Sequence, residues 1–428
     1  MKKFFSSIFL TAAVFIMSDG VYGAGLKINE DGTSEIINDY IAAEENQDIS
    51  FSAIEEIEPF SDLSLYENES KQGYYYDQLS DIDKYIYDQI DIKMPLLLEG
   101  KSDVIKINIS SKYTIYTTDG YDFFKAPITY IGYDHTEDFW LDTTITCLKG
   151  YQTSNKKITN VYYYFGEYRN STGTTYAPPY ETSEMALAEV ENVNLKANDI
   201  LAGISENATR YKKLQIINDW LVDNNSYNPY VAEENDEQAN KVAWMLTSAL
   251  LYGNGDDDTM YPVCEGYAEA FKLMCDSLDI PCVILVSSTH EWNAVQMEDG
   301  KWYYVDTTYN DPYIKGDYSD TAIEAIIEEY RYMHFLVGTD NSDISDSAHI
   351  VSLSKNLVPP DISESDYVYR NTGDADMDGY LTEADAALML RHIGGIGKMT
   401  SEQSASADIN GDGVITLTDV TKLLSKVG

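Results

Sequence analysis

The sequence predicts an α+β protein that ends in a small all-α module, and two regions carry this prediction. After Cys264, apolar residues recur at the spacing of one helix face, and an apolar strand and a hairpin follow directly. Near the C-terminus, two acidic loops begin 34 residues apart, and each leads into an amphipathic helix. We therefore expect a helix that starts at Cys264 to pack on an antiparallel sheet, with a separate helical module behind it.

Residues 1–23 have the pattern of a secretory signal peptide. Two lysines follow Met1, an apolar run extends from Phe4 to Met17, and Val21-Tyr22-Gly23 comes after it. The apolar run is too short to span a bilayer, and no other stretch is long and apolar enough to do so. We therefore expect a secreted, extracellular protein without a membrane span. Its four cysteines are too few for a disulfide framework.

Residues 24–72 are predicted to form an acidic, disordered spacer. Between Glu30 and Glu69 there are thirteen acidic residues and no Lys or Arg, a composition typical of disordered segments. Scattered apolar residues such as Ile36 and Ile37 leave a docked stretch as the alternative. The whole chain has a net charge of −43, which makes nucleic acid and anionic membrane surfaces poor partners.

One large module is predicted over residues 73–360, with an N-terminal α/β part at about 73–180 and a core at about 181–360. The predicted helices are Tyr74–Ile92 and a pair within Glu181–Asn225. The predicted strands are Val104–Thr117, Pro127–Trp140, Lys157–Phe165 and Pro281–Ser287. Tyrosine runs at residues 74–76 and 162–164 suit carbohydrate stacking or, more simply, half-buried faces of these elements.

Cys264 lies in the first turn of its predicted helix, where a cysteine is reactive. The apolar stripe behind it consists of Tyr267, Ala268, Phe271, Met274, Cys275 and Leu278. Free backbone N–H groups and the positive end of the helix dipole lower the pKa of a thiol at this position. Cys147, Cys275 and Cys282 are instead expected in the core, and a disulfide between the last two is a less favoured alternative.

His290 and Asp306 are the candidate partners of Cys264. The order Cys, His, Asp on helix, strand and strand suits a thiol nucleophile, because the imidazole takes the thiol proton and the carboxylate orients the imidazole. Each of these residues alone is more often structural. Their joint order and spacing favour a catalytic triad, which needs no cofactor.

A hairpin loop decides whether His290 and Asp306 can meet. Strands are predicted on either side of Glu298-Asp299-Gly300. If all three residues form the loop, Met297 pairs with Lys301, and His290 lies diagonally from Asp306 on the same face. A two-residue loop would put the two side chains on opposite faces, so the triad requires the three-residue loop.

Two C-terminal segments have the pattern of calcium-binding loops. Oxygen ligands fall at loop positions 1, 3, 5, 9 and 12, a backbone carbonyl at position 7 and glycine at position 6. In the first loop the expected ligands are Asp374, Asp376, Asp378, Tyr380, Thr382 and Asp385. In the second loop they are Asp408, Asn410, Asp412, Val414, Thr416 and Asp419. We expect two Ca²⁺, in loops that close tightly because aspartate replaces the usual glutamate at position 12.

The region around Cys264 also resembles a known family. The likeness is carried by Val263–Phe271, His290–Asn293 and Gly300–Asp311. These segments are similar to the transglutaminase-like superfamily of cysteine enzymes, above all to its bacterial surface members, and the likeness extends over roughly Tyr74–Pro360. The resemblance implies a papain-like fold in which Cys264, His290 and Asp306 correspond to the nucleophile, the base and the orienting acid.

The sequence departs from that family's pattern in two places. Glu291 stands where a small residue is usual after the histidine, and an acidic insertion at residues 253–258 precedes Cys264. The first could alter access to the histidine, and the second could reshape the substrate cleft. For the side chain of the oxyanion hole, Gln238 and Trp244 are the candidates beside the backbone N–H of Cys264.

The C-terminal repeat at residues 373–428, behind a linker at residues 361–372, resembles the dockerin module of cellulosome components. The resemblance implies that the chain binds a cohesin module on a scaffoldin and so joins a plant-cell-wall-degrading complex. Cohesin contacts of dockerins lie near loop positions 10 and 11, here Glu383-Ala384 and Leu417-Thr418. The two pairs differ in charge and size, which argues against two equivalent binding orientations.

Together these patterns predict a secreted, cellulosome-associated cysteine hydrolase or acyltransferase that acts on protein or peptide amides. The alternatives are a transglutaminase that cross-links proteins and a non-catalytic papain-like binding or adaptor module. A dockerin alone would suggest a glycoside hydrolase, but carboxylates are too abundant in this composition to support one.

Overall fold

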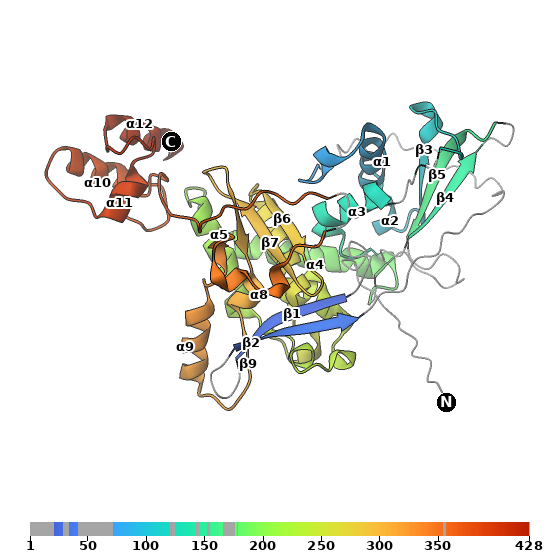
Figure 1. Ribbon diagram of the computed structural model, residues 1–428, viewed down its shortest axis with the longest axis horizontal. Coiled ribbons are helices and arrows are strands. Elements are labelled where there is room, and N and C mark those ends of the chain that lie inside the picture. Colours follow the sequence, from blue (N-terminus) through green and yellow to red (C-terminus); the bar gives the residue numbers. More distant parts are fainter. Residues whose placement is uncertain are drawn as a thin grey trace.

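The computed structural model describes residues 72–119, 121, 125–141, 145–151, 155–165, 176–177, 179–353 and 357–427, together with two strands nearer the N-terminus. The predicted signal peptide lies outside the described residues except for its last three, which begin the first strand. Figure 1 shows the helices and strands of the main body and the C-terminal helices α10 to α12 at one end of the molecule.

The first of the two N-terminal strands begins in the predicted signal peptide and continues into the predicted spacer, and the second lies in the spacer. β1 (Val21–Ile28) and β2 (Ser34–Ile41) pair antiparallel, and β1 also pairs in parallel with the short β9 (Tyr313–Ile314). In these strands the backbone groups pair in a sheet, which is the arrangement that the alternative of a docked stretch would give.

The first part of the main body joins helices to a three-stranded antiparallel sheet with the order β3-β5-β4. Its helices are α1 (Asp81–Asp91), α2 (Met94–Leu98) and α3 (Lys125–Asp134). Its strands are β3 (Val104–Asn108), β4 (Ile145–Tyr151) and β5 (Ile158–Phe165). The helix predicted from Tyr74 begins only at Asp81, because Ser80 caps it by accepting a hydrogen bond from the Asp83 N–H.

Two strand predictions in this part need correction. The strand expected at Val104–Thr117 ends at Asn108, whose side chain caps a following 3-10 turn. The strand expected at Pro127–Trp140 is instead α3 and a 3-10 turn. Pro127 falls in the first turn of α3, where a missing N–H breaks no helical bond. Ile128 and Ile131 are both buried at helical spacing, so packing selects the helix.

The core of the main body places one helix on a four-stranded antiparallel sheet with the order β10-β8-β7-β6. Its strands are β6 (Cys282–Val286), β7 (Glu291–Gln296), β8 (Trp302–Val305) and β10 (Phe335–Val337). Its helices are α4 (Ser183–Leu201), α5 (Arg210–Asn224), α6 (Pro229–Ala232), α7 (Cys264–Ser277), α8 (Thr307–Asn310) and α9 (Asp320–Tyr330). The predicted helix pair and the strand after α7 are confirmed.

Helix α7 is the centre of this core. It packs on β6 and β7, and Asn293 of β7 donates a hydrogen bond to the Ala268 carbonyl at 3.0 Å. Phe271 and Cys275 are fully buried on the helix, and Cys282 is buried on β6. Neither cysteine forms a disulfide, as expected for core residues. Truncation of a side chain such as Phe271 to alanine would cost about 3–5 kcal/mol of stability.

The C-terminal module is helical and has its own small core. Its helices are α10 (Glu383–Ile393), α11 (Ser401–Ala407) and α12 (Leu417–Val427). The buried apolar residues of this core are Ala375, Ala386, Met389, Ala407, Val420 and Leu423. The predicted class, an α+β core with a helix on an antiparallel sheet followed by a small all-α module, is confirmed.

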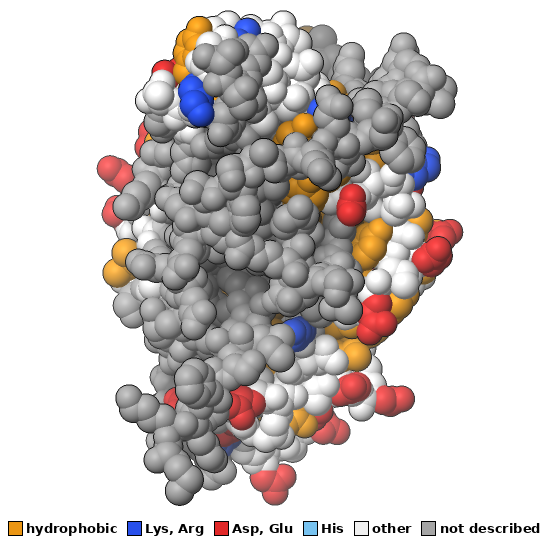
Figure 2. Space-filling model, turned by 90° about the vertical axis from the view of Figure 1, so that its right-hand side faces the viewer, with side chains coloured by type: hydrophobic (Ala, Val, Ile, Leu, Met, Phe, Trp, Pro, Cys, Tyr) orange, Lys and Arg blue, Asp and Glu red, His pale blue; other side chains and the backbone are white. Residues whose placement is uncertain are grey.

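The acidic composition is visible on the surface. Figure 2 shows acidic side chains spread over the described part of one face, with few lysines and arginines among them. This agrees with the net charge of −43.

Candidate active site

Cys264 is the first residue of α7. Val263 precedes it in an extended conformation and offers no side-chain cap, so the thiol lies at the positive end of the helix dipole. The thiol is fully buried and is not part of a disulfide. Two residues later, a Cβ on Gly266 would lie 2.3 Å from the Ser248 hydroxyl oxygen, so only glycine allows this close approach.

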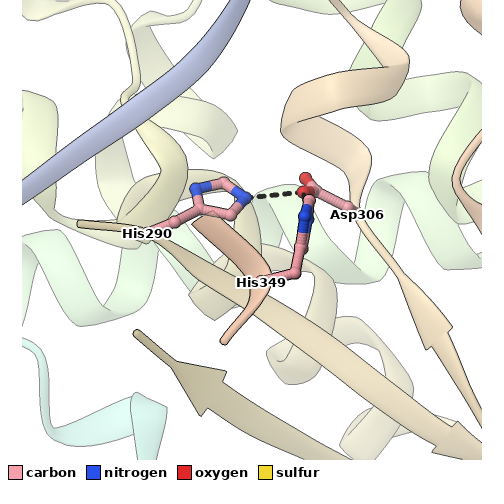
Figure 3. Close-up of side chains that lie close together, drawn as sticks. All are labelled: His290, Asp306 and His349. Atoms are coloured by element: carbon pink, nitrogen blue, oxygen red, sulfur yellow. Dashed lines mark hydrogen bonds and ion pairs between the residues drawn. The ribbon is translucent and has the colours of Figure 1, made fainter. Parts of the chain in front are cut away.

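The hairpin has the register that the triad requires. Val295 pairs with Tyr303, the Met297 N–H donates to the Lys301 carbonyl at 2.9 Å, and the loop contains three residues. This register places Asp306 directly after β8 and brings His290 to it. The Nε2 atom of His290 is 2.5 Å from Oδ2 of Asp306, as Figure 3 shows. The register prediction is therefore confirmed.

A third residue of this cluster, His349, was not predicted. Its Nε2 atom lies 2.9 Å from Oδ2 of Asp306, and its Nδ1 atom lies 2.9 Å from Oδ1 of Asp346. Figure 3 shows the rings of His290 and His349 approaching Asp306 from different directions. The spacing of Asp346 and His349 hints at a local Asp–His pair, but nothing local in the sequence indicates the contact with Asp306.

The charges in this cluster balance one another. Burial would raise the pKa of Asp306, but His290 and His349 outweigh it and hold that pKa well below its usual value. Burial would lower the pKa of His349, but its hydrogen bonds to Asp306 and Asp346 raise that pKa to about 9. His349 is therefore an imidazolium at neutral pH, placed between two carboxylates. The N–H of Tyr309 also donates to Asp306, at 3.0 Å.

The second ring nitrogen of His290 is available for chemistry. Its Nδ1 atom is buried and has no hydrogen-bond partner. The ring of Tyr309 packs beside the ring of His290. Its ring centroid is 4.9 Å from that of His290, and burial raises the pKa of its phenol, with Asp306 and Cys264 among the further causes.

Three glutamates are buried near one another on α7 and β7: Glu265, Glu269 and Glu291. Burial raises the pKa of all three, to about 8 for Glu269, and the nearby carboxyl groups of Glu269 and Glu291 add to the shift for Glu265. Neutral carboxyl groups at this depth avoid the cost of buried unpaired charge. Glu291 is only 1% exposed, so this departure from the family pattern adds a buried group and not a surface charge.

The two oxyanion candidates differ in environment. Gln238 is exposed, whereas the indole N–H of Trp244 is buried and has no hydrogen-bond partner. Trp244 ends a 3-10 turn, Lys241–Trp244, which packs against α7. In this turn the Ala243 carbonyl accepts a hydrogen bond from the Val263 N–H. The acidic insertion forms an exposed loop and a 3-10 turn, Asp258–Met260, just ahead of the helix.

The two predicted calcium loops have the same internal geometry. In each, the position-1 carboxylate accepts the N–H of the position-6 glycine at 2.7 Å, as Asp374 does for Gly379 and Asp408 does for Gly413. Both glycines have a positive φ, 92° and 87°. The position-12 carboxylate accepts the N–H of the position-9 threonine, at 2.8 Å in the first loop and 2.9 Å in the second.

The chemistry of the first loop fits a divalent cation. Oxygen atoms of Asp374, Asp376 and Asp378 converge within 4.8 Å of one another. Burial raises the pKa of Asp376 to about 6, and the charges of Asp385 and Asp378 contribute. A hard cation with oxygen ligands, such as Ca²⁺, would relieve this repulsion.

Comparisons with known proteins match two parts of the chain. A model of the transglutaminase-like superfamily matches residues 197–307, and a model of the dockerin type I domain matches residues 372–427. No curated protein matches the chain significantly. A solved structure described as the crystal structure of a TGase is similar over 43% of this chain and 49% of that chain, with 13% identity and a TM-score of 0.26. The match thus spans about half the length of that protein.

The dockerin match has consequences for the C-terminal module. Dockerin type I domains bind calcium, bind cohesins and belong to extracellular cellulosome components. Among the described residues, no helix is both long and apolar enough to cross a membrane. Since one match includes Cys264, His290 and Asp306 and the other includes both calcium loops, this chain combines a transglutaminase-like domain with a C-terminal type I dockerin domain.

Proposed function

We propose that the chain is a secreted cellulosome component whose transglutaminase-like domain is a cysteine hydrolase or acyltransferase acting on protein or peptide amides. One observation carries the proposal. Asp306 holds Nε2 of His290 at 2.5 Å, while Nδ1 of the same ring is buried and has no hydrogen-bond partner. The central helix of the same domain begins at Cys264. An imidazole held in this way carries its proton on Nε2 and presents Nδ1 as a base.

The reaction would proceed through a thioester. Nδ1 of His290 takes the thiol proton of Cys264, and the sulfur attacks the amide carbonyl carbon. His290 then returns the proton to the amide nitrogen, so that the C–N bond breaks and the amine leaves. Water or an amine attacks the thioester, His290 removes the proton of that nucleophile, and the thiol is released.

The oxyanion would be stabilised by two donors, one at the start of α7 and one in the 3-10 turn that packs against this helix. These are the backbone N–H of Cys264 and the indole N–H of Trp244, which is buried and has no other partner. A preorganised donor of this kind acts where charge develops in the transition state, and its removal typically costs about 10²–10³-fold in kcat. Trp244 is therefore a better candidate than the exposed Gln238.

His349 would act through Asp306 as a positioning residue. Its Nε2–H donates to the same carboxylate oxygen that binds His290, so it limits rotation of the carboxylate. Its positive charge also reduces the field of Asp306 at His290. The hydrogen bond thereby helps to keep His290 in the orientation that the reaction needs, whereas the charge makes His290 a weaker base.

Hydrolysis is the favoured outcome, because an extracellular enzyme meets abundant water. A transglutaminase, which passes the acyl group to an amine, uses the same first half-reaction. One observation favours the third candidate, a non-catalytic binding module: Cys264 and His290 are both fully buried, so substrate needs an opening to reach them.

The dockerin domain would bind two Ca²⁺ and a cohesin. The ligands in the first loop would be Asp374, Asp376, Asp378, Tyr380, Thr382 and Asp385. Those in the second would be Asp408, Asn410, Asp412, Val414, Thr416 and Asp419. Leu417, one of the predicted cohesin contacts, is 62% exposed, which supports a role in binding.

Alkylation of the thiols tests the catalytic proposal. We expect iodoacetamide at neutral pH to modify Cys264 well before Cys147, Cys275 and Cys282, because only Cys264 combines a helix N-terminus with a nearby base. Peptide mapping by mass spectrometry would measure the four rates. His290→Ala should slow the reaction of Cys264 and leave the other cysteines unchanged.

Two activity assays distinguish the hydrolase, the transglutaminase and the binding module. Release of new amino termini from peptides without amine incorporation indicates a hydrolase, and incorporation of a fluorescent amine indicates a transglutaminase. Cys264→Ser is the control for both assays. If Cys264 reacts no faster than Cys275 and if His290→Ala changes nothing, the catalytic proposal is wrong and the binding module remains.

A further inference from the structure

The first calcium loop lies against the transglutaminase-like domain, on the segment between α4 and α5. Two backbone hydrogen bonds join them: the Thr209 N–H donates to the Gly379 carbonyl at 2.9 Å, and the Leu381 N–H donates to the Asn207 carbonyl at 2.8 Å. Together they form an antiparallel bridge between Ala208 and Tyr380. The loop is thus joined to the neighbouring domain by an isolated backbone bridge.

A side chain of the linker reinforces this contact. The hydroxyl of Tyr369 donates to Oδ2 of Asp374 at 2.5 Å and lies 3.2 Å from the hydroxyl of Thr209, which can donate to it. Asp374 is position 1 of the loop, and Thr209 is the N-cap of α5. Tyr369 therefore connects a predicted calcium ligand directly to the other domain.

The packing at Gly379 is equally close. A Cβ at this position would lie 2.8 Å from Cγ and Cδ of Lys212. Glycine is needed here both for its positive φ of 92° and for this approach. In the second loop, no atom lies within 4 Å of a Cβ built on Gly413, and Val414 is 60% exposed. The two loops share their internal geometry, but only the first is an interface.

We propose that the first calcium loop is the joint that fixes the dockerin domain on the transglutaminase-like domain, and that calcium in this loop controls the joint. The residues that pair across the interface, Gly379 to Leu381, occupy loop positions 6 to 8, and the position-7 carbonyl of Tyr380 is itself a predicted ligand. Without a cation, Asp374, Asp376 and Asp378 repel one another and the loop opens. The bridge and the Tyr369 contact then lose their geometry.

This joint leaves the apolar surface of the dockerin accessible. Leu390, Leu417 and Leu424 are 46%, 62% and 44% exposed and take no part in the bridge. The dockerin can therefore be held by its own chain and by a partner protein at once. Calcium in the first loop then fixes the orientation of the transglutaminase-like domain relative to that partner. The inference does not depend on catalysis.

A matched pair of variants of the full chain tests the joint. Asp378→Ala and Asp412→Ala remove the position-5 ligand of the first and second loop, and each carboxylate accepts an equivalent loop N–H at 2.9 Å. We expect Asp378→Ala in calcium to increase the rate of limited proteolysis in the linker by about tenfold and to enlarge the particle in small-angle X-ray scattering. Asp412→Ala should leave both close to those of the wild type.

A variant that retains all calcium ligands guards against simple unfolding. Tyr369→Phe removes both hydroxyl contacts, and it should still bind two Ca²⁺ by calorimetry and keep its circular dichroism. Its linker should nevertheless be cleaved several-fold faster. Equal effects of Asp378→Ala and Asp412→Ala, or a Tyr369→Phe chain that scatters and digests like the wild type, would overturn the proposal.

Discussion

The site around Asp306 and the first calcium loop both concentrate carboxylates, but they differ in what balances the charge. Asp306 is buried between His290 and His349, whose rings hold its pKa well below the usual value despite burial. In the loop, burial and neighbouring carboxylates raise the pKa of Asp376 to about 6. The first site is balanced by the protein itself and should respond to pH, whereas the second needs a metal ion.

The comparison predicts the largest effect for calcium removal. Calcium at about a thousandfold excess over its dissociation constant stabilises a site by about 4 kcal/mol, and the small core of the dockerin domain has little else to hold it. Calorimetry of the full chain in calcium should show a dockerin transition that excess chelator abolishes. The main transition should move little, because no proposed calcium ligand lies in that domain.

The chelator experiment also has a clear contrary outcome. If both transitions shift together, or if circular dichroism of the helices does not change, the loops are not the elements that calcium stabilises. Asp374→Ala offers a check, since it should weaken calcium binding by at least about tenfold and should weaken cohesin binding with it.

Removal of Asp306 should give the next largest loss of stability, in the transglutaminase-like domain. Asp306→Ala leaves His349 as a buried cation with Asp346 alone and leaves His290 without its partner. Breaking a buried pair in this way costs about 3–5 kcal/mol. Thermal unfolding should show the loss in the main transition only.

Two further variants sharpen this result. Asp306→Asn, which keeps the shape and can still accept a hydrogen bond, should cost less stability but should still abolish most activity, because the His290 tautomer is no longer fixed. Asp378→Ala should leave the main transition unchanged. A stable Asp306→Ala protein would show that the two histidines do not depend on the carboxylate.

The charge of His349 predicts a smaller, pH-dependent effect. Burial lowers its pKa, but Asp306 and Asp346 raise it to about 9, above the value of about 6.5 in an unfolded chain. The stabilisation is therefore complete below pH 6.5 and is lost as pH rises through about 9. A fully buried group with this shift contributes about 3 kcal/mol. The rings of His290, His334 and Tyr309 also face His349.

Melting temperatures between pH 6 and 10 would measure this effect. The wild-type protein should lose stability steadily between about pH 6.5 and 9. His349→Gln should be less stable at pH 6 but should show a flatter curve over this range. Burial raises the pKa of Glu269 to about 8, so ionisation of this group also lowers the stability of both proteins as the pH rises towards 8. Because this effect is the same in both, the difference between their stability curves reports on His349 alone. Parallel curves would contradict the imidazolium assignment.

The sequence predicted those contacts whose residues lie close together along the chain. All ligands of a calcium loop lie within one short segment, so their pattern is visible locally. The contact of His290 with Asp306 is also nearly local, because the parity of the hairpin loop determines it. His349 reaches Asp306 from 43 residues away, through packing that no local pattern encodes.

The wrong predictions have similar causes. In α3, alternating apolar residues after Pro127 resemble a strand, but the buried Ile128 and Ile131 define a helix face only in the folded core. Strand β2 lies in a segment whose acidic composition suggests disorder, and the pairing of its partner β1 with β9 depends on residues almost 300 positions away. Composition and local period cannot report such contacts.

The smallest expected effect concerns the choice of substrate, and it extends the comparison from sites to the whole surface. The net charge is −43, and Asp256, Asp257 and Asp258 are exposed just ahead of Cys264. This field should favour neutral or basic peptides over acidic ones. Because the Debye length falls from about 30 Å at 0.01 M salt to about 8 Å at 0.15 M, a several-fold preference at low salt should nearly vanish at the higher one. Rates on matched acidic and basic peptides at both salt concentrations would decide. A preference for acidic peptides, or one that salt does not change, would mean that local contacts near Cys264 select the substrate and the overall charge does not.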